Sequence, residues 1–205
     1  MLKNNFDLVS MYSEKTEMKT IEEVFSAANF YRREYYLGDV CSEAADNFEA
    51  FVRFWNDYDN DLNVPVAERE PIKVFIDSGG GDLIAAFTII DSINLSKTPI
   101  WTINTGAAYS AGFFIFIAGH RRLTYALSSF MFHEGGVSGG SFDAHKFRNH
   151  ADFYSTQLKQ LKEHTLKCTG WTSEFYEKIQ KDDYWLTAPE AIEKGVADEI
   201  VMEGI

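Results

Sequence analysis

The sequence predicts an α/β protein in which crossover helices join the strands of a parallel sheet. Short apolar runs typical of buried strands alternate with longer segments whose apolar residues recur at helical spacing. A strand, helix, strand, helix order favours parallel strands, because antiparallel neighbours need only short turns between them. With 205 residues, 45% of them hydrophobic, the chain is long enough for one domain with a full core.

The first half of the chain carries this alternation most clearly. Strands are predicted at residues 34–37, 72–77 and 100–103, and helices at residues 42–58, at residues 82–95 and after Ser110. Asp82 opens the second of these helices and can cap it with its side chain. Residues 1–32 are mixed in character and give no firm element.

In the second half, a short strand at residues 129–133 precedes a glycine-rich arm and a long helix at residues 143–168. A further helix at 173–179, a strand around Trp185 and a helix at 187–194 that opens on a capping box complete the chain. Apolar residues of the long helix step by four and three in a narrow seam: Phe147, Ala151, Tyr154, Leu158 and Leu161. This seam fits an ordinary core helix and a contact between subunits equally well.

Composition excludes several classes of function. The net charge of −12, from 31 acidic and 19 basic residues, argues against nucleic acid or an anionic membrane as a partner. Cys41 and Cys168 have no metal-ligand spacing, the histidines form no cluster with a carboxylate, and we expect neither a metal nor a cofactor. The N-terminus lacks the apolar core of a signal peptide and residues 111–118 are too short to cross a bilayer, so we expect a cytoplasmic protein.

Three features together indicate nucleophilic catalysis. Ser110 stands among small residues between a strand and a helix, His133 ends a strand, and residues 78–81 are a serine followed by three glycines. Taken singly, the serine is a helix cap, the histidine a core residue and the glycine run a turn. Taken in order, they supply a nucleophile, a base and backbone N–H groups that approach a substrate carbonyl closely.

These residues resemble the ClpP family, the proteolytic subunits of the ATP-dependent Clp protease. The resemblance runs from about Arg33 to Ile200 and is carried by residues 75–81, 106–112, 131–133, 183–191 and 195–198. It implies the ClpP/crotonase-like fold, with a strand and a helix protruding as a handle. It also implies a divergent N-terminal segment at residues 1–32 and a serine peptidase domain at residues 33–205.

The resemblance implies a Ser–His–Asp triad of Ser110, His133 and Asp183, with Asp182 as the neighbouring candidate for the carboxylate. In such a triad the histidine takes the serine proton and the carboxylate holds the imidazole in the right tautomer. The oxyanion hole would be formed by the backbone N–H groups of Gly81 and Ala111.

The resemblance also implies peptide and unfolded protein substrates, rings of seven subunits and a Clp-type ATPase as a possible partner. Several positions depart from the family. Gly79 replaces a usual proline, Tyr109 is bulkier than the usual serine or alanine, and Asp182 replaces an arginine used in pairing between rings. Because of Asp182 and the net charge, we expect double rings at raised ionic strength and their loss at low salt.

Two alternatives stay open at this point. A ClpP-like subunit without catalytic activity would contribute only structure to a mixed ring. An enzyme of the crotonase family would share the fold and bind acyl-CoA thioesters, with two backbone amides for the enolate oxygen. That enzyme would not need Ser110, His133 and Asp183 together, and the sequence offers no basic site suited to the phosphates of coenzyme A.

Overall fold

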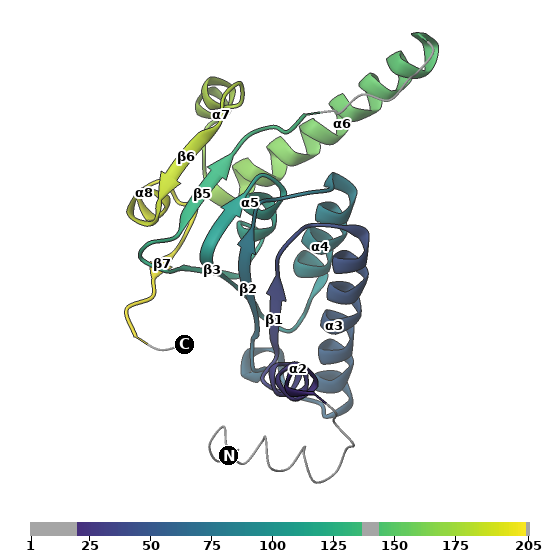
Figure 1. Cartoon of the computed structure of the whole chain (residues 1–205), viewed down its shortest axis with the longest axis vertical. Coiled ribbons are helices and arrows are strands. Elements are labelled where there is room, and N and C mark those ends of the chain that lie inside the picture. The colour runs from purple at the N-terminus through teal and green to yellow at the C-terminus, as the bar shows by residue number, and fades with distance from the viewer. Residues whose placement is uncertain (1–19, 137–143, 204–205) are drawn as a thin grey trace.

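A largely parallel sheet organises the molecule, seen here in a computed structural model that describes residues 20–136 and 144–203 (Figure 1). Within those residues the sheet has seven strands, and its main path follows the order β1-β2-β3-β4-β7. These strands are β1 (Glu34–Leu37), β2 (Ile72–Ser78), β3 (Ile100–Tyr109), β4 (Arg121–Thr124) and β7 (Glu199–Ile200), and all pair in parallel. Strand β5 (Ser129–Phe132) branches off beside β3, and β6 (Tyr184–Thr187) pairs antiparallel with β5.

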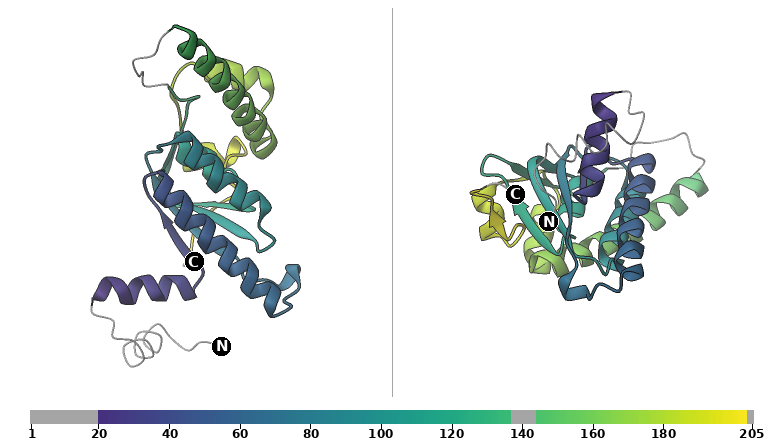
Figure 2. Two further views of the ribbon diagram at one scale, coloured as in Figure 1. Left: turned by 90° about the vertical axis from the view of Figure 1, so that its right-hand side faces the viewer. Right: turned by 90° about the horizontal axis from the view of Figure 1, so that it is seen from below.

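Helices pack beside this sheet and extend beyond it. They are α2 (Ile21–Tyr31), α3 (Ser42–Asp61), α4 (Leu83–Leu95), α5 (Ala111–Phe116), α6 (Ala144–Thr169), α7 (Ser173–Ile179) and α8 (Ala188–Glu193), with a 3₁₀ turn at Val66–Glu68. Helices α3 and α4 run side by side along one face of the sheet, while α7 and α8 flank β6 (Figures 1 and 2). The α/β class, the parallel sheet and the crossover helices are therefore confirmed.

The predicted helix at 42–58 forms and continues to Asp61, because its apolar residues define one buried face. Strand β2 buries Ile72, Val74 and Ile76 in alternation. The Asp82 side chain caps α4 by accepting the N–H of Ala85 at 2.8 Å, as predicted.

Strand β3 is longer than predicted and serves two partners. Residues Trp101 to Asn104 pair with β4, whereas Ala107 to Tyr109 pair with β5. The predicted strand ended before the small residues at 106–108, but they continue β3, and Gly106 lies so close to Asp77 that a Cβ atom there would be 2.6 Å from its Oδ1. Their small size thus permits close packing in a continuous strand, which ends next to Ser110.

Helix α2, the 3₁₀ turn at Val66–Glu68 and strands β4 and β7 were not predicted. Helix α2 forms at 21–31 with a capping box between Thr20 and Glu23, although the mixed composition of residues 1–32 had given no assignment. Strands β4 and β7 are only four and two residues long, and both lack a strong apolar pattern. Residues 1–19 and most of the glycine-rich arm lie outside the described residues.

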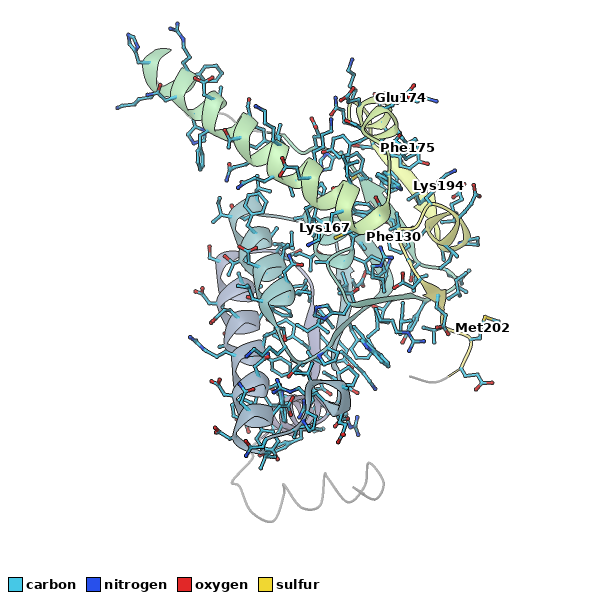
Figure 3. All side chains as sticks on the ribbon, turned by 180° about the vertical axis from the view of Figure 1, so that it is seen from behind. Phe130, Lys167, Glu174, Phe175, Lys194 and Met202 are labelled. Atoms are coloured by element: carbon cyan, nitrogen blue, oxygen red, sulfur yellow. The ribbon has the colours of Figure 1, made fainter. Side chains whose placement is uncertain are left out.

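The predicted seam of α6 divides into two parts. Leu161 is buried in the core and Leu158 packs against it. Phe147 is 61% exposed, on the half of the helix that projects away from the sheet, whereas Lys167 marks the end that lies against the body (Figure 3). The helix is a core element at one end only.

A buried ion pair ties the start of β1 to the end of α3. Arg33 donates two hydrogen bonds to Asp59, at 2.6 and 2.8 Å, and the Thr98 hydroxyl donates a third at 2.7 Å. The Arg33 guanidinium also lies 4.3 Å from the ring centroid of Trp55. Burial would raise the pKa of Asp59, but the hydrogen bonds from Arg33 and Thr98 hold it below its ordinary value.

Candidate active site

Ser110 forms the junction between β3 and α5. Its backbone adopts φ 51° and ψ −120°, a conformation that residues with a Cβ atom rarely adopt. The N–H of Ser110 donates to the Met131 carbonyl at 2.9 Å, and its own carbonyl accepts the N–H of Phe113 at 3.0 Å. Strand β5 and helix α5 therefore hold this strained residue from both sides.

His133 follows the last residue of β5 and faces Ser110. Since β5 runs parallel to β3, with Met131 opposite Tyr109, the residues just beyond the two strand ends come together. The His133 Nε2 atom lies 2.7 Å from Ser110 Oγ, within hydrogen-bond distance. A serine hydroxyl in this contact can pass its proton to the imidazole.

Asp183 reaches the other side of the imidazole from the start of β6. Phe132 pairs with Tyr184 across the antiparallel ladder, which places the preceding Asp183 next to His133. The distance from Asp183 Oδ1 to His133 Nδ1 is 3.8 Å, close enough for electrostatic attraction and too long for a hydrogen bond. The two side chains are 56% and 30% exposed, so water reaches this pair.

The glycine turn, residues 78–81, lies directly against Ser110 where β3 meets α5. A Cβ atom on Gly80 would be 2.8 Å from Ser110 Cβ, and one on Gly81 would be 2.1 Å from the Val40 carbonyl oxygen. Both glycines have positive φ, and Val40 clamps the turn through hydrogen bonds to Gly80 and Asp82. Among the described residues, the N–H groups of Gly81 and Ala111 have no hydrogen-bond acceptor, so both can donate to a bound group.

A cleft of about 480 Å³ opens beside Ser110 and His133. Its walls come from the glycine turn and the first turn of α4, from α5, from the segment after β5 and from one face of α6. Tyr154 on α6 donates a hydrogen bond to the Glu134 carbonyl at 3.4 Å, and burial raises the pKa of its hydroxyl. The sequence pattern had indicated Tyr154 and Leu161 as an apolar seam, but not that the same face lines this cleft.

Tyr109, the bulky neighbour of Ser110, does not line the cleft. Its ring packs edge-on against Trp185, with the centroids 5.1 Å apart, and its hydroxyl lies 2.7 Å from Ser129 Oγ. Successive residues of a strand point to opposite faces, so this side chain leaves the space in front of Ser110 open.

Another contact at this site was not predicted from the sequence. His164 Nε2 lies 3.0 Å from the Phe114 carbonyl oxygen in the last turn of α5. Because α5 has only six residues, this contact anchors much of the element that begins at Ser110. Its sequence signal is weak, since His164 is one polar residue among many on α6.

Residues 20–136 and 144–203 contain neither a candidate metal site nor a candidate membrane span. No group of three or more His, Cys, Asp or Glu side chains there is arranged to hold a metal ion. None of the helices described is long and apolar enough to cross a membrane.

Comparison with known proteins extends these observations. A model of the Clp protease family matches residues 64–204, a range that includes the glycine turn, Ser110, His133 and Asp183. Proteolytic subunit 2 of the ATP-dependent Clp protease of Treponema pallidum (strain Nichols) is 30% identical over 139 residues, which cover 64% of this chain and 67% of that protein. Proteolytic subunit 3 of the enzyme of Rhizobium etli is 32% identical over 143 residues, or 66% and 70% of the two chains. From its sequence and its sheet of crossover units, this chain belongs to the Clp protease family.

Proposed function

We propose that this protein is a serine endopeptidase in which Ser110, His133 and Asp183 form the catalytic triad. The observation that carries the proposal is the 2.7 Å contact between Ser110 Oγ and His133 Nε2, made by a serine in a strained strand-to-helix turn. Membership of the Clp protease family supports peptide hydrolysis over the alternative of an enzyme that acts on acyl-CoA.

The reaction follows from the geometry. Ser110 Oγ attacks the carbonyl carbon of the scissile peptide bond while His133 Nε2 takes the hydroxyl proton. The negative charge that forms on the carbonyl oxygen is stabilised by the N–H groups of Gly81 and Ala111. His133 then protonates the leaving amine, and water, activated by the same imidazole, hydrolyses the acyl-enzyme.

Asp183 holds His133 in the tautomer that carries its proton on Nδ1. At 3.8 Å the carboxylate attracts the imidazole electrostatically, and a small approach during catalysis would complete the hydrogen bond. Asp183 is the better candidate than Asp182, because the register of β6 places Asp183 beside the imidazole.

A peptidase site open to solvent would cleave cellular proteins indiscriminately unless the assembly enclosed it. We propose that the protein works in a ring of seven subunits and that a Clp-type ATPase supplies the ring with unfolded protein. The names of both relatives describe proteolytic subunits of an ATP-dependent protease. The projecting half of α6, where Phe147 and Phe153 are 61% and 63% exposed, is the surface we assign to contacts between rings.

Hydrolysis of short fluorogenic peptides tests the proposal. Wild-type protein should cleave them, and Ser110→Ala should lose on the order of 10⁴-fold or more in rate while remaining folded. The matched control is Ser155→Ala, because Ser155 is an exposed residue that bonds only to its own helix, and this variant should retain activity. Hydrolysis that survives Ser110→Ala would contradict the triad, and no hydrolysis by wild type would favour a subunit without catalytic activity.

A further inference from the structure

Helix α6 turns one face towards the cleft beside Ser110. His150, Tyr154, Gln157 and Leu161 line the cleft, at intervals of four, three and four residues. Gln157 is only 8% exposed, while its neighbours Thr156 and Lys159 are exposed. Since Gln157 lies on the cleft face, its long polar side chain is covered by the body of the protein.

The amide of Gln157 has no hydrogen-bond partner within residues 20–136 and 144–203, in contrast to Tyr154 one turn earlier, whose hydroxyl bonds to Glu134. Its polar atoms are not sealed away from solvent, so they face the cleft. A largely buried amide without a partner in the protein keeps only part of the hydrogen bonding that it would have in open water. A substrate group that bonds to it would restore them.

We propose that Gln157 selects substrates with a carboxamide side chain, glutamine above all, at the residue whose carbonyl Ser110 attacks. The inference rests on the proposed peptidase function and specifies its substrate class. An amide offers both N–H donors and a carbonyl acceptor, and a second amide satisfies both at once. A carboxylate only accepts and an ammonium only donates, so each leaves one end of Gln157 unpaired.

The other walls of the cleft suit this side chain. Leu83, Ile84, Phe114 and Leu161 supply apolar surface for the two methylene groups of a glutamine. A polar group placed among apolar walls discriminates strongly, because a substrate that lacks the matching group leaves the buried amide unpaired.

Two fluorogenic peptides that differ only at this residue test the proposal, one with glutamine and one with methionine, which have nearly the same shape. Wild-type protein should cleave the glutamine peptide about tenfold more efficiently in kcat/KM. Gln157→Met removes the amide at almost constant volume and should abolish or reverse that preference. Gln160→Met is the matched control, since Gln160 is an exposed residue of the same helix outside this cleft, and it should preserve the preference.

A second variant, Gln157→Glu, guards against failure of the first to fold. It keeps the side-chain length but only accepts hydrogen bonds, so it should lower the ratio of glutamine to methionine cleavage and favour a third peptide that carries lysine at this residue. If Ser110-dependent hydrolysis persists and neither Gln157 variant alters the ratio of rates, the selectivity proposal is wrong and the peptidase function stands. A wild-type preference for methionine would overturn it as well. If Ser110-dependent hydrolysis of both peptides is absent, the proposed function and this inference fail together.

Discussion

Two pairs of a carboxylate and a basic side chain, at opposite ends of the parallel strands, contrast sharply. Arg33 and Asp59 meet at 2.6 Å with side chains that are 7% and 1% exposed. His133 and Asp183 stand 3.8 Å apart with side chains that are 30% and 56% exposed. The Arg33–Asp59 pair is buried and hydrogen-bonded. The His133–Asp183 pair is close enough for electrostatic attraction but makes no hydrogen bond.

The difference reflects what each pair has to do. A buried charge must be fully paired, because transfer of an unpaired ion out of water costs several kcal/mol. A catalytic carboxylate has to hold an imidazole whose charge appears only during the reaction, so it needs its tightest contact only when substrate is bound. The scaffold pair therefore affects folding, and the proposed catalytic pair affects rate.

The largest expected effect is a loss of catalytic rate when the His133–Asp183 pair is altered. Asp183→Asn should lower kcat on the order of 10⁴-fold, because an amide favours the wrong imidazole tautomer. The free energy of unfolding should change little, since Asp183 is more than half exposed. Steady-state kinetics with a fluorogenic peptide gives the rate, and Asp182→Asn is the control expected to retain activity. The opposite ranking of the two variants would place the triad carboxylate at Asp182.

Altering the buried Arg33–Asp59 pair should lower stability and leave the catalytic rate nearly unchanged. Asp59→Asn leaves the Arg33 guanidinium buried without its counter-ion, which should lower the free energy of unfolding by about 3–5 kcal/mol. Urea denaturation measures this change, and the peptidase rate of the protein that remains folded should be close to wild type. A loss below 1 kcal/mol would show that the pair adds little to the fold.

Acid provides a milder test of the same pair. The pKa of Asp59 is lowered in the folded protein, so its contribution to stability is present above the unfolded pKa, about 3.9, and disappears as the pH falls through the folded value. The stability of wild type should therefore drop on acidification more steeply than that of Asp59→Asn. Thermal denaturation across this pH range checks the slopes, and parallel curves for the two proteins would contradict the assignment.

The sequence predicted the sheet class and most elements, because each lies in a strong local pattern. Local patterns also indicated Ser110 and His133, whereas the choice of Asp183 for the proposed triad came from the resemblance to the ClpP family. Gly80 and Gly81 mark a turn, and Ser110 follows an apolar strand. The rest depends on contacts distant in the sequence. Strand β4 is four residues long and gains its stability from β3 and β7, which no local signal reports. The burial of Gln157 likewise requires α6 to pack across the cleft.

The smallest expected effect concerns assembly. With a net charge of −12 per subunit and Asp182 in place of a basic residue, repulsion between rings should be screened by salt. Sedimentation at about 0.05 M and 0.5 M salt, ionic strengths that bracket a Debye length of about 10 Å, should show double rings only at the higher value. Active monomers at both concentrations would rule out the chamber, and double rings at both would refute the argument from charge.

Covalent labelling with a fluorophosphonate, followed by mapping of the modified residue, tests the central claim most directly. The contact between Ser110 Oγ and His133 Nε2 at 2.7 Å predicts one label per chain, located on Ser110. His133→Ala should slow labelling severely because the hydroxyl loses its base, and Ser110→Ala should abolish it. A label on another serine, or labelling at the wild-type rate in His133→Ala, would contradict the assignment of Ser110 and His133 as nucleophile and base.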